Sequence, residues 1–266
     1  MTDDQPYIKF AHVSKTFGSQ RVLDDVSFEV RHGEMVVVLG RSGVGKSVTL
    51  KHLMGFLHPD AGEVWVAGRE VSRLPELELL DLRRRITMVF QSGALFDSLT
   101  LAENVAYPIR ERAVHDEVLL DEDDIHTRVN ELLGLVDLPL EARHLAPADL
   151  STGMKRAVAI ARALAAKPEC LLYDEPTTMV DPLMAATIGD LILKLKKRTG
   201  LTSVVVTHDM KLMRKLADRV VFLVDGKVAF FGPIGELNAC EEPMVQAFIY
   251  LDEMPTLATA GGGVSV

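Results

Sequence analysis

The sequence predicts an α/β fold built around a mostly parallel sheet, and two observations support this prediction. Short apolar runs alternate with segments of helical periodicity along most of the chain. One run, Met35–Leu39, is continuously apolar, which is typical of a strand buried on both faces of a parallel sheet. With 266 residues, 48% of them hydrophobic and 25% charged, the chain can form one large domain or two small ones.

Further strands are expected from runs of similar composition. Short β-rich pieces precede Met35 within residues 7–39, and apolar runs recur at 170–174, 203–207 and 220–224. The "DGK" after the last run is a hairpin turn signal, which predicts a final strand at 228–231.

Helices are expected where apolar residues recur on one face. Residues 125–136 show this spacing. The acidic run at 121–124 could suggest a metal site, but acids at a helix N-terminus favour the helix dipole, which explains them better. A second helix is predicted at 182–199, with Gly200 ending it. The strand-poor stretch from about 92 to 165 predicts a helical insert, and the tail from 256 to 266 has little to bury and is expected to be disordered.

Bulk properties exclude several classes of protein. A formal net charge of −9 argues against non-specific nucleic-acid binding. The two cysteines, Cys170 and Cys240, form no C-x-x-C pair, which indicates a reducing compartment without a disulfide framework. We expect neither a signal peptide nor a membrane-spanning helix, because no apolar run approaches the roughly 18 residues that such a helix needs. A partner could still bring the chain to a membrane.

The segment "GRSGVGKS" (40–47) matches G-x-x-x-x-G-K-[ST] between a predicted strand and a predicted helix. Glycines allow the backbone N–H groups to converge on phosphate oxygens, and the following helix adds its positive end. Lys46 would reach the β- and γ-phosphates, and Ser47 would offer its hydroxyl to Mg²⁺. A chance match is expected in about one chain in a hundred of this length, so the segment predicts nucleotide binding.

Two adjacent carboxylates, Asp174 and Glu175, end the apolar run at 170–174. Successive strand residues point in opposite directions, so we expect Asp174 to support Mg²⁺ and Glu175 to polarise an attacking water. The alternative is that both acids merely begin a loop. His208, after the run at 203–207, could contact a γ-phosphate, although a lone histidine at a strand end is usually just solvated. Asp181 precedes Pro182 and is expected to cap the helix at 182–199.

In this order, the motifs resemble those of an ATP-binding-cassette (ABC) ATPase. The resemblance implies an ABC ATPase domain at 6–245, with a RecA-like core, an N-terminal antiparallel β subdomain and a helical subdomain at about 92–165. It implies that the tail, 246–266, contacts a partner and is then disordered. ATP and Mg²⁺ are the implied cofactors. The implied ATP-binding residues are Phe17, which would stack on adenine, Gly40, Ser42, Gly43, Gly45, Lys46, Ser47 and the Q-loop residue Gln91.

The resemblance also implies roles for the remaining motifs. Glu175 and His208 would be catalytic, Asp181 would belong to the D-loop, and Ser47, Gln91 and Asp174 would hold the metal ion. The "LSTGM" at 150–154 resembles the signature motif, whose Ser151 and Gly153 would close over the ATP of a second copy. The usual signature is LSGGQ; Thr152 and Met154 depart from it, and Ala157 stands where many relatives have arginine, which leaves the rate and affinity open.

A narrower resemblance lies at 91–111 and 243–250, which are similar to the ATPase subunits of Mla/MCE-type phospholipid transporters. It implies an integral membrane permease, an MCE-domain protein and often a STAS-domain subunit as partners, at the cytoplasmic face of the inner membrane. Leu95, Phe96 and Leu99 are apolar and follow the Q-loop, so we expect them to contact the permease.

Two alternatives remain open at this point. The chain could be the ATPase of another ABC importer or exporter, which would share every ATP motif. It could also be a soluble ABC ATPase that acts on DNA or ribosomes. Only about 60 residues separate Gln91 from Ser151, too few for a long coiled-coil insert, and the sequence holds a single cassette without a basic patch.

Overall fold

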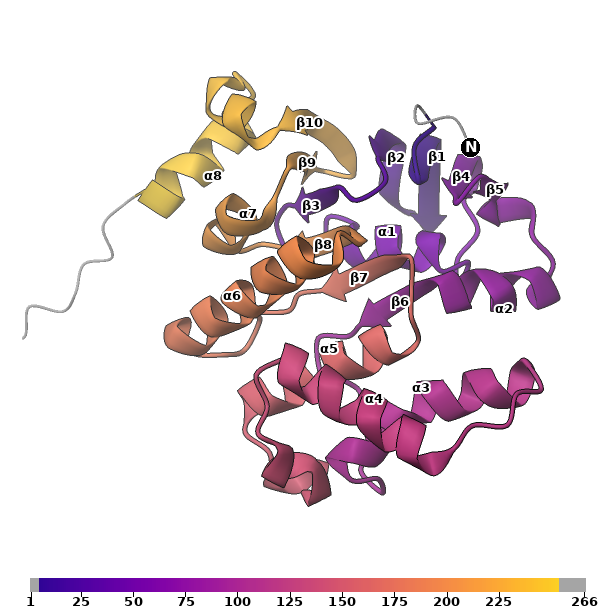
Figure 1. Cartoon of the computed structure of the whole chain (residues 1–266). Helices are drawn as coiled ribbons and strands as arrows, with labels where there is room; N and C mark the ends of the chain where they lie inside the picture. The colour runs from indigo at the N-terminus through magenta and orange to yellow at the C-terminus, as the bar shows by residue number, and fades with distance from the viewer. Residues whose placement is uncertain (1–4, 254–266) are drawn as a thin grey trace, which may run out of the picture.

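Two sheets form the centre of the computed structural model, which describes residues 5–253 (Figure 1). The first is antiparallel, with strand order β2-β1-β4-β5. Its strands are β1 (Ile8–Phe17), β2 (Gln20–Val30), β4 (Ala61–Val66) and β5 (Arg69–Glu70). The second has strand order β10-β9-β3-β8-β7-β6 and is parallel except for β10. Its strands are β3 (Met35–Leu39), β6 (Ile86–Val89), β7 (Cys170–Asp174), β8 (Thr202–Thr207), β9 (Arg219–Val224) and β10 (Lys227–Pro233).

The predicted α/β fold, with a mostly parallel sheet and an N-terminal antiparallel sheet, is confirmed. The continuous apolar run of β3 is explained by burial on both faces. Met35, Val37 and Leu39 face the helical layer, whereas Val36 and Val38 face the N-terminal sheet and α1 (Lys46–Leu53). The hairpin turn is also confirmed: Asp225 (φ 48°) and Gly226 (φ 78°) both adopt the left-handed conformation that a type I′ turn requires.

Helices cover the six-stranded sheet and extend beyond its β6 edge. Figure 1 shows α3 (Leu101–His115), α4 (Glu122–Leu135) and α5 (Thr152–Ala165) together in a layer below the sheet. The helices α6 (Pro182–Thr199) and α7 (Met210–Leu216) pack against each other, and α7 also contacts β3 and β8. Helix α8 (Pro243–Glu253) contacts α7 and ends the described chain. Short 3-10 turns lie at Val71–Arg73, Leu140–His144, Pro147–Asp149 and Ile234–Ala239.

The predicted helix ends are confirmed where polar caps mark them. The Asp181 carboxylate accepts from the Met184 N–H at 3.0 Å, and Gly200 ends α6 with a left-handed φ of 62°. At α4 the Asp121 carboxylate accepts from the Asp123 N–H at 3.0 Å, so the acidic run caps a helix as expected. Within the described residues, no group of three or more His, Cys, Asp or Glu side chains could hold a metal ion.

The structure adds elements that the periodicity does not predict, namely β4, β5, β6, α2 (Glu76–Arg85), α7 and α8. Strand β6 forms the edge of the parallel sheet beside β7 and leads into Gln91. None of the helices in the described range is both long and apolar enough to span a bilayer. The tail predicted to be disordered, 256–266, lies outside the described residues.

Candidate nucleotide site

The loop at 40–45 joins the end of β3 to the start of α1, and Lys46 and Ser47 of the motif are the first two residues of that helix. Gly43 (φ 85°) and Gly45 (φ 105°) adopt left-handed conformations that favour glycine. A Cβ at Gly45 would also lie 2.6 Å from Leu23 Cδ2 and 2.9 Å from the Val22 carbonyl oxygen, so a larger residue would displace the loop. Helix α1 begins at Lys46, and the N–H groups of its first turn have no partner within the helix. This local backbone is the anion-binding form that the motif predicts.

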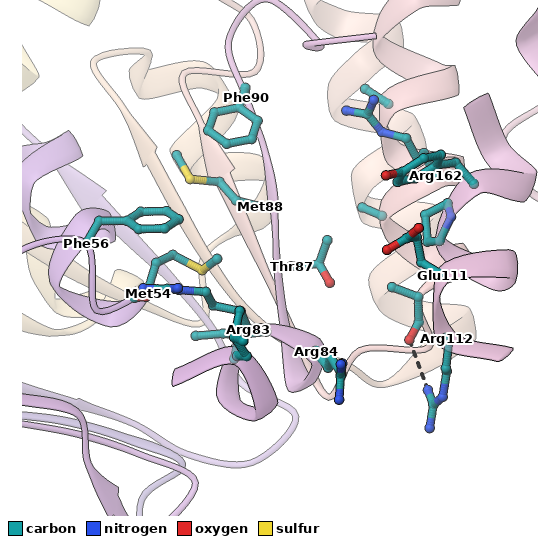
Figure 2. A pocket seen from close by; sticks show the side chains of 17 residues that line it. Met54, Phe56, Arg83, Arg84, Thr87, Met88, Phe90, Glu111, Arg112 and Arg162 are labelled. Atoms are coloured by element: carbon teal, nitrogen blue, oxygen red, sulfur yellow. Dashed lines mark hydrogen bonds between the residues drawn. The ribbon is translucent and has the colours of Figure 1, made fainter. Parts of the chain in front are cut away.

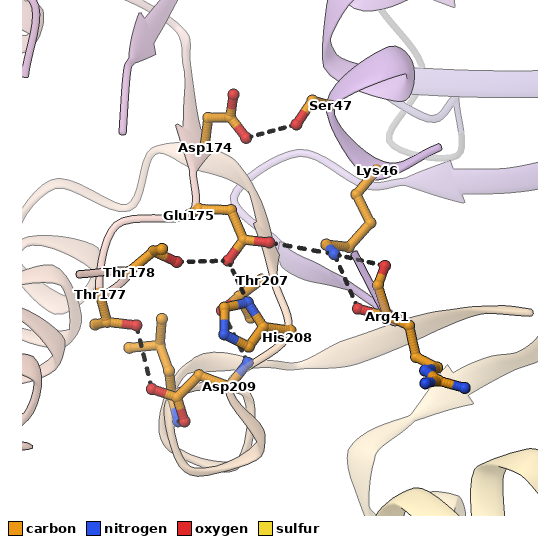
Figure 3. A network of polar contacts seen from close by, with 12 residues as sticks. Arg41, Lys46, Ser47, Asp174, Glu175, Thr177, Thr178, Thr207, His208 and Asp209 are labelled. Atoms are coloured by element: carbon orange, nitrogen blue, oxygen red, sulfur yellow. Dashed lines mark hydrogen bonds and ion pairs between the residues drawn. The ribbon is translucent and has the colours of Figure 1, made fainter. Parts of the chain in front are cut away.

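Lys46 is a buried cation at the centre of the site (Figure 3). Its Nζ donates to the carbonyl oxygens of Gly40 (2.8 Å) and Arg41 (3.0 Å). The same Nζ lies 3.2 Å from Glu175 Oε1, and the two side chains are only 5% and 12% exposed. The cation that would receive a phosphate is therefore paired with a carboxylate in this structure.

The two adjacent acids have different partners, as their alternation along the chain predicts. Asp174 Oδ1 accepts from Ser47 Oγ at 3.0 Å. Burial raises the pKa of Asp174, and the Ser47 hydrogen bond opposes that shift. Glu175 Oε2 instead lies 2.9 Å from His208 Nδ1 and accepts from Thr178 Oγ1 at 3.0 Å. The backbone of Glu175 is left-handed (φ 46°), which turns the chain out of β7.

A cavity of about 310 Å³ brings together most of the predicted ATP-binding and catalytic residues. It is lined by Val22, Ser42, Gly43, Gly45, Lys46, Ser47, Val48, Gln91, Glu175, Thr178 and His208. A recessed cation and loop amides suit a polyphosphate, and the hydroxyl–carboxylate pair of Ser47 and Asp174 supplies the oxygen ligands that Mg²⁺ prefers. The residues present thus fit a nucleotide with its metal ion. Thr178 is absent from the sequence-based set, because no spacing rule distinguishes its hydroxyl from that of Thr177.

The predicted nucleotide-site residues outside this cavity lining are Phe17, Gly40, Asp174, Asp181 and the signature residues Ser151 and Gly153. Phe17 ends β1, is 44% exposed, and has Lys15 Nζ 5.7 Å from its ring centroid. Ser151 caps α5 by accepting from the Met154 N–H at 3.2 Å and is exposed. A Cβ at Gly153 would overlap the thioether of Met184. The Lys46 cavity therefore contains no signature residue from its own chain.

A second, larger hollow of about 530 Å³ lies between the sheet edge and the helical layer (Figure 2). Apolar side chains from separate elements line it, among them Phe56, Met88, Phe90 and Tyr107. Charged side chains also line it, namely Arg83, Arg84, Glu111, Arg112 and Arg162. We call this hollow the β6–α3 groove. Its lining residues come from distant parts of the sequence, so periodicity could not reveal it.

The predicted permease contacts lie beside the β6–α3 groove and are not part of its lining. Phe96 is 43% exposed, and its ring centroid is 4.9 Å from that of Tyr107, which does line the groove. Leu95 packs against the core of the helical layer, and Leu99 is half-buried. Phe96 is therefore the most accessible of the three.

The sequence is similar to a known protein family and to several characterised relatives. The family model described as "ABC transporter" matches residues 23–178. The methionine import ATP-binding protein MetN of Mesorhizobium japonicum is 40% identical over 88% of this chain, and the chain spans only 62% of that protein's length. The Arabidopsis thaliana protein TRIGALACTOSYLDIACYLGLYCEROL 3, chloroplastic, is 38% identical over 92% of this chain and 74% of its own length.

Solved structures give the same fold. The dimeric, post-hydrolysis structure of the ATP-binding cassette MJ0796 with ADP and Pi is 33% identical, with a TM-score of 0.76 over 85% of this chain and 98% of that one. The cbiO1 structure from Clostridium perfringens, described as part of the ABC transporter complex cbiONQ, is 26% identical with a TM-score of 0.78 over 93% and 96% of the two chains.

Proposed function

The chain belongs to the ABC transporter family, and from this premise we propose that it is the ATP-hydrolysing subunit of a membrane transporter. The observation that carries the proposal is the Lys46 cavity, in which Glu175 and His208 lie within hydrogen-bond distance of each other and beside the phosphate-binding loop. ATP and Mg²⁺ are the proposed ligands. Bound Mg²⁺ would neutralise charge on the phosphates, held by Ser47 and Asp174 with Gln91 nearby.

The Lys46–Glu175 pair suggests how the residues of this chain would act in hydrolysis. A phosphate entering the cavity would offer Lys46 a more highly charged partner than Glu175. Glu175 would then be released from the cation and could accept a proton from the attacking water. His208, 2.9 Å from Glu175 Oε2, would keep the carboxylate at the γ-phosphate end of the cavity.

We infer that the chain works as a pair. The Lys46 cavity lacks signature residues, and the related cassette MJ0796 is described as dimeric with ADP and Pi. In the proposed dimer, Ser151 and Gly153 of one copy close over the nucleotide of the other, with Asp181 at the same face. This chain departs from the usual signature region at Thr152, Met154 and Ala157. The rate at which its dimer closes therefore has to be measured on this chain itself.

The sequence resemblance suggests a lipid transporter. The names of the relatives instead favour an importer of a different substrate. Several relatives with about 37–40% identity are named as methionine import ATP-binding proteins. An MCE-domain protein and a STAS-domain subunit have no support from these names. We therefore propose import of a small molecule such as methionine, through a permease that holds this subunit at the cytoplasmic face of the inner membrane.

Lipid transport is the second candidate, because one specific observation favours it. The relative whose name refers to trigalactosyldiacylglycerol, a glycolipid, matches this chain over 74% of its own length, compared with 62% and 67% for methionine-import relatives of Mesorhizobium and Brucella. The segment at 91–111, which carries the resemblance to lipid transporters, contributes Tyr107, Pro108 and Glu111 to the lining of the β6–α3 groove.

Co-purification distinguishes these candidates. The tagged chain would be isolated with its partners from detergent-solubilised membranes of its own organism, and the partners identified by mass spectrometry. Methionine import predicts a small-molecule permease, and lipid transport predicts a permease accompanied by an MCE-domain protein. Recovery of ribosomes or DNA-binding proteins without any permease would overturn the transporter proposal itself.

A further inference from the structure

Arg156 is a buried cation without an acidic partner among the described residues. Only 6% of the residue is exposed, and burial lowers the pKa of its guanidinium. It forms no ion pair within residues 5–253, and its Nε is buried without a hydrogen-bond partner. Burying an uncompensated charge is costly, so a structural role in packing α5 would be served better by an apolar side chain.

The guanidinium joins two segments that border the Lys46 cavity. Arg156 Nη1 donates to the Phe90 carbonyl at 3.3 Å, directly before Gln91. Its Nη2 donates to the Thr178 carbonyl at 3.4 Å. On the other side of Gln91, Arg162 of the same helix donates to the carbonyls of Gly93 (3.0 Å) and Ala94 (2.7 Å). Helix α5 therefore holds the chain on both sides of Gln91.

Thr178 continues this connection to the carboxylate of Glu175. Its backbone carbonyl is held by Arg156, and its Oγ1 donates to Glu175 Oε2 at 3.0 Å (Figure 3). The Thr178 N–H also donates to the Glu175 carbonyl at 3.2 Å, so the turn between them is fixed at both its backbone and its side chain. A continuous series of hydrogen bonds thus runs from the Phe90 carbonyl through Arg156 and Thr178 to Oε2 of Glu175.

We propose that Arg156 and Thr178 are positioning residues for hydrolysis, which together set the orientation of the Glu175 carboxylate. Arg156 fixes the Thr178 carbonyl relative to the end of β6, and the Thr178 hydroxyl fixes Glu175 Oε2. Arg156 lies outside the lining of the Lys46 cavity and Thr178 is part of it, but the effect proposed for both residues passes through the Glu175 carboxylate. The inference rests on the proposed function of Glu175 as the base, and it extends the site to the helix that begins with the signature motif.

The first test removes the Thr178 hydroxyl and then restores it. We expect Thr178→Val to lower the kcat for ATP hydrolysis about tenfold while the KM for ATP changes less than about twofold, because the loss affects the reaction and not nucleotide binding. Thr178→Ser should recover most of the rate. Thr199→Val is the matched control, since it also removes a threonine hydroxyl, at the far end of α6, where Oγ1 donates to the Leu195 carbonyl.

The second test examines Arg156 and the route of its effect. Arg156→Met should lower kcat by a similar factor, and Arg156→Lys, which keeps one donor group, should lie between it and the wild type. In a Glu175→Gln background, Thr178→Val and Arg156→Met should cause no further loss, because the group that they position is already absent. Urea unfolding of each variant identifies any that is not folded.

The outcomes separate the inference from the function on which it rests. Absence of ATPase activity in the wild type, or substantial activity in Glu175→Gln, would overturn the proposed function. An inactive Glu175→Gln combined with wild-type kcat in Thr178→Val would overturn the positioning role alone. Two further outcomes would assign these residues a purely structural role and so overturn the inference. One is that Thr178→Ser does not restore kcat. The other is that Thr178→Val and Arg156→Met lower kcat by the same factor in the wild type and in the Glu175→Gln background.

Discussion

At the scale of single residues, Glu175 combines a strained backbone conformation with a side chain whose charge is neutralised by Lys46. Glu175 has a left-handed backbone (φ 46°), which for a residue with a side chain costs about 1 kcal/mol or more. Its carboxylate is held by Lys46, Thr178 and His208. The strained conformation is therefore retained by contacts that lie within the cavity, where ATP would compete for one of them.

The first prediction concerns the proposed base. Glu175→Gln should keep nucleotide binding and lower hydrolysis by about a hundredfold or more, because the amide keeps its shape but cannot accept the proton. Lys46→Ala should weaken nucleotide binding itself. Steady-state ATPase and equilibrium nucleotide-binding assays check both expectations. Turnover near the wild-type rate in Glu175→Gln would exclude Glu175 as the base.

The second prediction follows from the raised pKa of Asp174. Because burial raises this pKa above the ordinary value of 3.8, the folded state binds the proton more tightly than the unfolded state does. The contribution of Asp174 to stability is therefore present below pH 3.8 and is lost as pH rises through the raised pKa. At pH 7, Asp174→Asn should increase the free energy of unfolding of the nucleotide-free protein, because the amide has no charge to desolvate.

Urea unfolding of Asp174→Asn and the wild type, compared at pH 7 and at the lowest pH at which both are folded, measures this difference. The gain should shrink toward acidic pH, since both proteins are then uncharged at this position. An equal gain at both pH values would show that desolvation of the carboxylate is not its cause. The same substitution should weaken binding of Mg²⁺ with ATP.

The positions of site residues were predictable from the sequence where a motif fixes them locally. The glycine loop and Lys46 depend on spacing within eight residues, and the cavity lining includes Ser42, Gly43, Gly45 and Lys46. Arg156 and Thr178 could not be predicted in this way. The partners of Arg156 lie 66 and 22 positions away in the chain, and nothing in the sequence shows that its guanidinium is buried.

At the scale of elements, helices with polar caps are predicted better than short strands. Helix α6 has a capping aspartate, an initial proline and a terminal glycine, so the sequence marks both of its ends. Strand β6 has only four residues and follows Arg85 of α2 directly, with Ile86 already extended. No turn residue separates the two elements, so neither α2 nor β6 is marked in the sequence.

The third prediction concerns the start of α5. Gly153→Asp should leave ATP binding to the monomer intact and abolish the ATP-bound dimer, because a carboxylate would face the γ-phosphate held by the second copy. The new side chain must also displace the Met184 thioether. Gel filtration with ATP in a Glu175→Gln background measures the dimer.

Gly134→Asp is the matched control for this experiment. It adds the same charge at an exposed helical glycine of α4, where a Cβ meets no atom within 4 Å. This variant should dimerise as the parent does. A dimer that survives Gly153→Asp would contradict the role of the signature motif between copies.

At the scale of the whole molecule, we expect the β6–α3 groove, which is lined by apolar side chains together with four arginines and Glu111, to contact the membrane partner. The fourth prediction is that Tyr107→Asp and Phe96→Asp both weaken association with the permease while nucleotide binding is unchanged. Loss of an apolar anchor and burial of a charge should cost about 2 kcal/mol. Tyr107→Asp should have the larger effect, since Tyr107 lines the groove and Phe96 contacts it through that ring.

Co-purification of the tagged variants with solubilised membrane partners checks this prediction. Val114→Asp is the control, because Val114 is 79% exposed on the same helix and lies outside the groove lining. An equal loss for all three variants would indicate a general effect of added charge on α3. No loss for Tyr107→Asp would place the permease contact elsewhere.

The position of Met184 against Gly153 also gives the proposed dimer face a sensitivity to oxidants. Met179 is 88% exposed in the same D-loop region, whereas no sulfur atom lines the Lys46 cavity. Peroxide converts a thioether to a polar sulfoxide, which would bring an unpaired oxygen to a surface that must close tightly. Mild oxidation should therefore reduce ATP-driven pairing before it reduces nucleotide binding, and a Met179→Leu, Met184→Leu protein should resist it.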